Sequence, residues 1–315
     1  MKPQIPFWHT IQKPIIGLAP MDGITDPAFR AICDVIGHPD LLYTEFVSAD
    51  GLVRNKKLLR TFATHKTNTP LVGQLFGKDP KAMEEAASML IEQTGVVCID
   101  INMGCPAKRV AQHGGGAALI KTPDIAQKLI ASVNSAIQKS GKSIGLSVKT
   151  RIGYDTIITK EWISVLLEMP INAIALHGRT LKQQYSGLAH WDEIQIAADL
   201  AKKKHILLFG NGDIASLAEA KEKIENYSSD GVLIGRATLG NPWVFSETIP
   251  TFEDRINAAV LHCNYFDALT PDANPLSLRK HLGWYIKGAP NASEIRRKLI
   301  QIKTTDEARG ILRNI

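Results

Sequence analysis

Eight short runs of apolar and β-branched residues recur along most of this chain, and their spacing limits its fold more than any other feature. The runs span residues 14–21, 41–48, 70–77, 96–104, 145–153, 173–179, 205–213 and 231–238. Helix-like segments separate most of them. Residues 122–141, for example, begin with Thr122 and Pro123 and end at Gly141, which are typical helix-start and helix-stop residues. Strands that alternate with helices in this way predict a (β/α)8 barrel.

A doubly wound parallel sheet is the competing fold. It usually carries a G-x-G-x-x-G turn after its first strand, and no such turn follows Met21. From about residue 250 the strand period stops, and the remaining sequence reads as helices at residues 252–270, 275–288 and 292–303, separated by prolines. We therefore predict a barrel over residues 1–245 and a small all-helical domain over residues 246–315.

The composition narrows the class of protein. The 315 residues are 44% hydrophobic and 22% charged, which is ordinary for a globular chain. No apolar run is long enough for a transmembrane helix and the N-terminal residues lack a signal-peptide pattern, so we expect a cytoplasmic protein. The four cysteines form no C-x-x-C pair and have no histidine at metal-ligand spacing, so we expect neither a disulfide framework nor a metal site.

Glycines and polar residues follow the last two predicted strands, at the end of a barrel where function collects. These strands end in "FGNGD" and "IGRAT". The glycines let backbone N–H groups approach a ligand, and the arginine can form a fork on an anion, so we predict a phosphate-bearing ligand here. The predicted phosphate site consists of Asn211, Gly212, Asp213, Gly235 and Arg236.

Basic side chains end two strands in the middle of the series. Lys149 and Arg151 are two residues apart, as are His177 and Arg179, so each pair shares a strand face. A cationic pocket of these four residues suits a reduced flavin and a polyanionic substrate. Alternatively, Lys149 could form a Schiff base with a carbonyl substrate.

The fourth strand ends in "NMGCPAK", which places Cys105 before a proline and near the glycines 114–116. This arrangement predicts a reactive thiol over a pocket, with a mobile loop at residues 111–118 that can close on it. Gln74 lies at the end of the third predicted strand and Asn102 at the end of the fourth. Their side-chain amides suit the edge of an isoalloxazine or a nucleobase.

The formal net charge is +6, and basic residues gather in two stretches. Between residues 279 and 303, Glu294 is the one acidic residue, and Trp284, Tyr285 and His281 add stacking capacity. The basic residues of this segment are Arg279, Lys280, Lys287, Arg296, Arg297, Lys298 and Lys303, and a second stretch contains Arg54, Lys56, Lys57, Arg60 and Lys66. Two basic stretches beside one pocket predict a nucleic-acid partner.

Together these motifs resemble the tRNA-dihydrouridine synthases, and most closely their bacterial B-type branch. The resembling segments are "APMDGITD", "DINMGCPAK", "VKTRIG", "HGRT", "NGDI", "IGRATLGNPWVF" and "RKHLGWY", in this order over nearly the whole chain. The resemblance implies an FMN-bound barrel that reduces one D-loop uridine of tRNA to dihydrouridine with NADPH. Hydride would go to C6 of the uracil, and Cys105 would protonate C5. A thiol suits this role because it can donate a proton without carrying a charge beforehand.

The resemblance also implies roles for the other residues. FMN would contact Pro20, Met21, Asp22, Gln74, Lys149, His177, Asn211, Gly212, Asp213, Gly235 and Arg236. The flipped-out uridine would face Asn102, Lys149, Arg151 and His177. The cationic pocket adds Arg179 to this substrate site, and the basic charge of the C-terminal segment predicts tRNA contacts at Arg279, Lys280, Arg296, Arg297 and Lys298. The family suggests a monomer.

Other functions stay open at this point. A flavin barrel of the dihydroorotate type would act on a free pyrimidine, and an aldolase would trap its substrate at Lys149. A dihydroorotate-type enzyme would give no role to the basic C-terminal segment. A tRNA-binding chaperone would use that segment and would keep its activity without Cys105.

Overall fold

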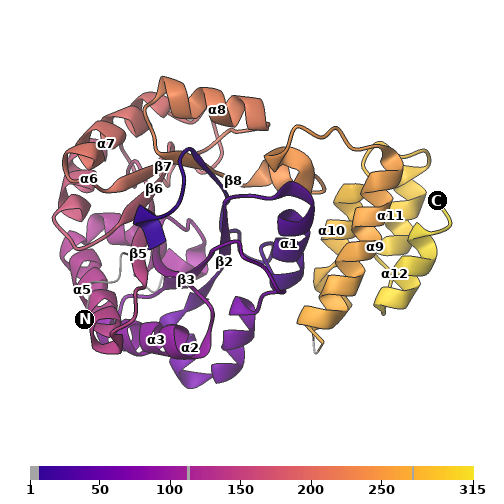
Figure 1. The fold of residues 1–315 in the computed structure, drawn as a ribbon, viewed down its shortest axis with the longest axis horizontal. Helices are drawn as coiled ribbons and strands as arrows, with labels where there is room; N and C mark the ends of the chain where they lie inside the picture. Colours follow the sequence, from indigo (N-terminus) through magenta and orange to yellow (C-terminus); the bar gives the residue numbers. More distant parts are fainter. Residues whose placement is uncertain (1–6, 112–113, 272) are drawn as a thin grey trace.

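The computed structural model describes residues 7–111, 114–271 and 273–315 (Figure 1). Eight parallel strands form one closed barrel in sequence order, and β8 pairs back onto β1. The strands are β1 (Ile15–Leu18), β2 (Leu41–Ser48), β3 (Leu71–Phe76), β4 (Cys98–Met103), β5 (Gly145–Arg151), β6 (Ala173–His177), β7 (Leu207–Asn211) and β8 (Gly231–Ile234). The predicted (β/α)8 barrel is confirmed, and each strand lies within its predicted run.

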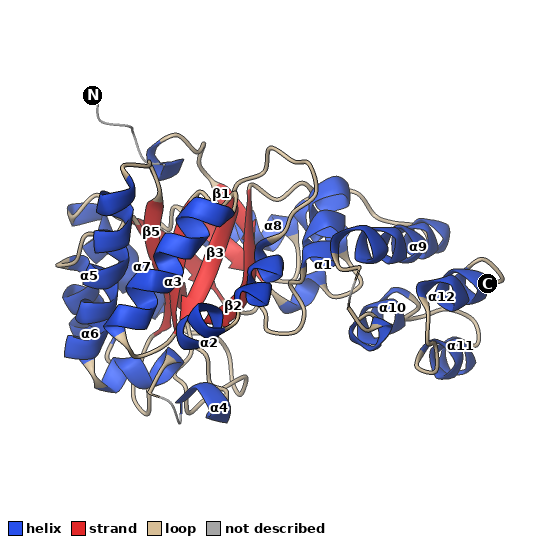
Figure 2. Cartoon of the chain, turned by 90° about the horizontal axis from the view of Figure 1, so that it is seen from below, coloured by secondary structure: helices blue, strands red, loops and turns tan. Residues whose placement is uncertain are grey.

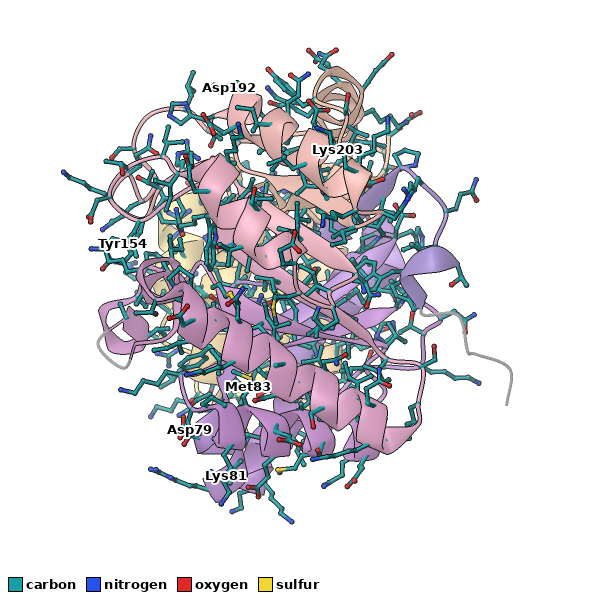
Figure 3. All side chains as sticks on the ribbon, turned by 90° about the vertical axis from the view of Figure 1, so that its left-hand side faces the viewer. Asp79, Lys81, Met83, Tyr154, Asp192 and Lys203 are labelled. Carbon is teal, nitrogen blue, oxygen red and sulfur yellow. The ribbon has the colours of Figure 1, made fainter. Side chains whose placement is uncertain are left out.

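Helices surround the strands, as Figure 2 shows. They are α1 (Pro27–Ile32), α2 (Ala49–Arg54), α3 (Pro80–Gln93), α4 (Lys108–Ala111), α5 (Pro123–Ser140), α6 (Thr159–Leu167), α7 (Trp191–Lys203) and α8 (Leu217–Asn226), with the short 3-10 helices η3 (Lys56–Phe62) and η4 (Gly116–Lys121). In α7, Asp192 lies in the first turn and Lys203 in the last (Figure 3), which complements the helix dipole.

Two layers of apolar side chains hold the barrel together. The larger layer lies between the strands and the surrounding helices, and a smaller one fills the barrel with residues such as Tyr43 and Phe209. Trp8 closes the N-terminal end of the barrel, where its Nε1 donates to Cys98 Sγ over 3.3 Å. The opposite end, at which the strands finish, is therefore the one left open for a site.

The C-terminal helices lie to one side of the barrel, next to α1 (Figures 1 and 2). They are α9 (Phe252–Leu269), α10 (Arg279–Tyr285), α11 (Ala292–Leu299) and α12 (Thr305–Leu312), with the 3-10 helix η7 (Pro275–Ser277) before α10. Their core includes Ala28 and Ile32 of α1 and also Trp243, so they are packed onto the barrel rather than tethered to it. The three predicted helical segments are confirmed, and α12 is an addition that the sequence reading did not contain.

Two sequence expectations fall on residues outside the described ranges. Residues 1–6 belong to the N-terminal segment that lacks a signal-peptide pattern, and residues 112–113 belong to the predicted mobile loop at residues 111–118. Within the described ranges, no helix has both the length and the apolar character needed to cross a membrane.

Candidate active site

A cavity of about 910 Å³ opens at the carboxyl ends of the strands. Every strand or the loop after it contributes to the lining, except for β3. The predicted site residues that line it are Pro20, Met21, Asp22, Asn102, Cys105, Lys149, Arg151, His177, Asn211, Gly212, Asp213, Gly235 and Arg236. Gln74 and Arg179 do not line it, and the five predicted tRNA contacts lie on the C-terminal helices.

The strand register brings the polar residues of the cavity together. Asn102 of β4 lies opposite Lys149 of β5, and Arg151, His177 and Asn211 lie side by side on β5, β6 and β7. Lys149 Nζ donates to Asn211 Oδ1 over 3.0 Å. Burial, together with the charge of Arg151, lowers the pKa of Lys149 to about 8. Lys149 is therefore mainly an ammonium group at neutral pH, and an anionic ligand would stabilise its charge.

His177 does not carry the charge that the sequence reading gave it. His177 is 9% exposed. Burial and the neighbouring charges of Arg151 and Lys149 hold the pKa of His177 well below its ordinary value. The imidazole is therefore neutral, and the positive charge of the cavity comes from Lys149 and Arg151, with Arg236 at its edge.

A chain of hydrogen bonds runs beneath the cavity and ends at Cys105. Asn102 Oδ1 accepts from the backbone N–H groups of Gly104 at 3.1 Å and Cys105 at 2.9 Å. Asn102 Nδ2 donates to Gln74 Oε1 over 2.9 Å, and Gln74 Nε2 donates to Asp100 Oδ2 over 2.7 Å. Gln74 is completely buried, so in this structure its amide supports Asn102 instead of facing a ligand.

Asp100 is a site residue that the sequence reading missed. It is completely buried, and Ser147 Oγ donates to its second carboxylate oxygen over 2.5 Å. Burial raises the pKa of Asp100 to about 6, against the lowering effect of these hydrogen bonds. The signal that could have revealed it is a carboxylate within the otherwise apolar run 96–101.

Cys105 is also held from the other side. Arg151 Nε donates to the carbonyl oxygen of Gly104 over 2.7 Å. The backbone N–H of Ala117 donates to the carbonyl oxygen of Cys105 over 3.2 Å. Gly116 has a φ of +60°, and a Cβ added there would lie 2.9 Å from the Cys105 carbonyl oxygen. The glycine-rich segment therefore contacts Cys105 directly, and only glycine permits this approach.

Asp213 connects two arginines at the predicted phosphate site. Its Oδ2 accepts from Arg179 Nη2 at 2.5 Å and from the backbone N–H of Ala189 at 2.8 Å, and its Oδ1 accepts from Arg236 Nη2 at 3.1 Å. Arg179 is 2% exposed and lies behind Asp213, so it positions that carboxylate and does not face the cavity. Tyr185, which the sequence reading did not select, lies 4.8 Å from the Arg236 guanidinium and lines the cavity.

Replacing Asp213 by asparagine is expected to reduce the free energy of unfolding at pH 7 by about 1–3 kcal/mol, because buried Arg179 loses its anionic partner. Burial alone would raise the pKa of Asp213, but the hydrogen bond from Arg179 and that from Ala189 lower it below 3.8. The stability that the Asp213 carboxylate contributes to the wild type is therefore fully present above pH 3.8 and is lost as pH falls through the lowered pKa.

Chemical denaturation at pH 7 and pH 3 measures this difference. The matched control is Asp155→Asn, because the Asp155 carboxylate pairs with Lys121 on the surface, with 56% and 53% of the two side chains exposed. This change should cost less than about 1 kcal/mol. Equal losses in both variants at pH 7 would contradict the role given to Asp213.

The C-terminal basic residues divide into two groups. Arg279 donates to the carbonyl oxygen of Ile302, and Lys280 donates to that of Gly23, so both have partners within the fold. Arg296, Arg297 and Lys298 are exposed on α11. The second stretch, with Arg54, Lys56, Lys57, Arg60 and Lys66, is also exposed.

The expected stacking side chains need correction. His281 and Tyr285 are completely buried, and the His281 ring lies 5.0 Å from that of Phe29 in α1. They hold α10 against the barrel and cannot stack on a nucleic acid in this fold. Trp284 is partly exposed.

The open end of this barrel carries a thiol, a lysine and, next to glycines, the predicted phosphate site. This is the organisation of a (β/α)8 enzyme, in which the site lies at the carboxyl ends of the strands. Residues 17–315 match the dihydrouridine synthase (Dus) family, which is nearly the whole chain. This chain belongs to the dihydrouridine synthase family.

Individual relatives agree with this placement. The probable tRNA-dihydrouridine synthase of Staphylococcus aureus (strain COL) is 32% identical over 318 residues, covering 97% of this chain and 94% of that protein. The probable tRNA-dihydrouridine synthase 1 of Synechocystis sp. is 31% identical over 307 residues, covering 93% of this chain and 84% of that protein. The fold is similar to that of histamine dehydrogenase from Rhizobium sp. 4-9, with a TM-score of 0.53 and 12% identity over 79% of this chain and 48% of that chain.

Proposed function

We propose that this protein reduces a D-loop uridine of tRNA to 5,6-dihydrouridine, with FMN as the bound cofactor and NADPH as the reductant. The observation that carries the proposal is Cys105 at a cavity that also presents Lys149, with its backbone N–H held by Asn102 and the preceding carbonyl oxygen held by Arg151. The curated relatives are named as probable tRNA-dihydrouridine synthases, which supports tRNA as the substrate.

The cavity fits FMN by size and by chemistry. Its volume of about 910 Å³ lies in the range of cofactor sites. Arg236 and the backbone at Gly235 and Gly212 would hold the phosphate, because the glycines permit a close approach. Lys149 and the Asn211 amide would face the polar edge of the flavin ring, and the chemistry that bound FMN supplies is hydride transfer from NADPH to C6 of uracil.

Cys105 would complete the reduction. Hydride addition at C6 leaves C5 to take up a proton, and the C5–C6 double bond becomes a single bond. The Cys105 thiol gives up its proton to C5, and solvent returns a proton to the sulfur. Asn102 and Arg151 keep the thiol in place, since each holds a backbone group of Gly104 or Cys105.

The helical domain at residues 246–315 would bind tRNA and the barrel at residues 1–245 would carry the chemistry, with the protein acting as a cytoplasmic monomer. Exposed Arg296, Arg297 and Lys298 on α11 provide contacts for the phosphate backbone. The target uridine must leave its stack to reach the cavity, as bases do in other enzymes that modify them. Binding should therefore weaken as salt concentration rises.

A comparison of substrates tests this function. Protein loaded with FMN and supplied with NADPH is incubated with unmodified tRNA, with free uridine and with orotate, and NADPH oxidation is followed without oxygen. We expect NADPH to be consumed in the presence of tRNA and not in the presence of free uridine or orotate. Consumption with a free pyrimidine but not with tRNA would favour an enzyme of the dihydroorotate type and overturn the proposal.

A further inference from the structure

A second cavity lies between the barrel and the C-terminal helices, outside the site described above. Its volume is about 390 Å³. Glu45 near the end of β2 and Asp26 before α1 line one side, and Phe266 and Leu269 of α9 line the other. Arg60 and Lys280, both exposed, belong to the same lining. The cavity therefore combines carboxyl groups, apolar walls and two cations.

One loop separates the two cavities. Residues Met21, Asp22 and Ile24 line the first cavity, whereas Gly23 lines the second. The backbone N–H of Gly23 donates to Glu45 Oε1 over 2.6 Å, and Lys280 Nζ donates to the Gly23 carbonyl oxygen. A polymer that places one group in the first cavity can therefore reach the second along the same face of the barrel.

Glu45 calls for a ligand that supplies N–H donors. Burial, together with the nearby charge of Asp26, raises the pKa of Glu45 to about 7. A carboxyl group with a raised pKa has too few donors around it to compensate for its charge. Among the described residues, the Glu45 carboxyl group accepts one hydrogen bond, from Gly23 to Oε1, and Glu45 lines the cavity.

A nucleotide satisfies the remaining features. The exposed Arg60 and Lys280 suit a phosphate. The partly exposed Leu269 and the edge of the buried Phe266 form an apolar wall that suits contact with a flat ring. Guanine presents two adjacent donors, N1–H and N2–H, on its Watson–Crick edge, which match a carboxylate. The volume of about 390 Å³ accommodates one nucleoside and is too large for a tight site for a small amino acid.

We propose that the second cavity binds an unstacked guanine of the tRNA while the target uridine occupies the first. This proposal rests on the proposed function, because it assigns a second contact to the same substrate. Occupying both cavities fixes the distance between the two nucleotides along the RNA. The second cavity would then help to select which uridine is reduced.

The test uses two neighbouring residues of η7. Ser277 lines the second cavity and is exposed, whereas Leu276 beside it is 51% exposed and does not line it. The variants Ser277→Trp and Leu276→Trp therefore place the same large side chain inside and outside the cavity. KM and kcat for an unmodified tRNA transcript are measured, together with the Kd for FMN.

We expect Ser277→Trp to raise KM for tRNA by about tenfold or more, the effect of losing one hydrogen bond to a charged group, with an unchanged Kd for FMN. Leu276→Trp should match the wild type. A set of transcripts carries inosine, which lacks the N2 amino group, in place of one D-loop guanosine at a time. At one position this replacement should raise KM for the wild type. It should not raise KM further for Ser277→Trp, because the cavity of that variant is already blocked.

Two results would overturn the proposal. One is equal KM values for both variants and the wild type, and the other is an inosine series in which no D-loop position raises KM for the wild type. If the wild type reduces no uridine in any transcript although FMN is bound, the proposed function fails, and that result is distinct from a failure of the second cavity.

Discussion

Replacing Cys105 by alanine is expected to lower the rate of uridine reduction at saturating tRNA by about 10²–10⁴-fold, the usual contribution of a positioned acid. Cys105 is 8% exposed and lines the cavity, and its backbone N–H donates to Asn102. Removing Sγ eliminates the proton donor but none of the hydrogen bonds made by the Cys105 backbone. The affinities for FMN and for tRNA should therefore stay within a few-fold of the wild type.

The measurement is the amount of dihydrouridine formed per minute at saturating tRNA and NADPH, with FMN affinity recorded alongside. Cys263→Ala is the matched control, because Cys263 is a completely buried thiol in the core of the C-terminal helices. It should retain the wild-type rate once it has folded. Full dihydrouridine formation by Cys105→Ala would remove the thiol from the chemistry and would contradict this prediction.

Replacing Lys149 by methionine is expected to weaken FMN binding by about 10- to 100-fold, which corresponds to the loss of a hydrogen bond to a charged group. Lys149 Nζ contacts Asn211 within the cavity, and its pKa of about 8 lies below the ordinary value of 10.5. The wild-type affinity for FMN should fall as pH rises through about 8, because the ammonium group is lost. The variant should lack this dependence.

Stability separates this effect from damage to the fold. Because the folded-state pKa of Lys149 is lowered, the protonated side chain destabilises the fold at neutral pH, and this cost disappears as pH rises from about 8 towards 10.5. Lys149→Met should therefore be at least as stable as the wild type at pH 7 while binding FMN less tightly. A variant that loses stability and affinity together, with an unchanged pH profile, would contradict the role assigned to Lys149.

The barrel could be predicted because its information is local. Each strand is a short apolar run followed by a helix with its own start and stop residues, so the period is visible without knowledge of tertiary contacts. The missed helix α12 had a local signal too, since Thr304 accepts from the backbone N–H of Glu307 three residues later. That capping pattern is present in the sequence.

The site was predicted less completely because hydrogen-bond partners depend on the tertiary fold. The sequence placed Gln74 and Arg179 at strand ends, but the structure turns Gln74 towards Asp100 and Arg179 towards Asp213. Similarly, the sequence of α10 does not reveal that His281 packs against Phe29 of α1. A residue type and its position in a strand predict a role at the site only when its other neighbours are known.

Unmodified tRNA incubated with the FMN-loaded protein and NADPH, then digested and weighed as fragments, is the most direct measurement of the proposed reaction. We expect one fragment from the D-loop to gain the mass of two hydrogen atoms, located on a uridine. An unchanged set of fragments, from protein that binds FMN and oxidises NADPH, would contradict the proposal that this chain reduces uridine in tRNA.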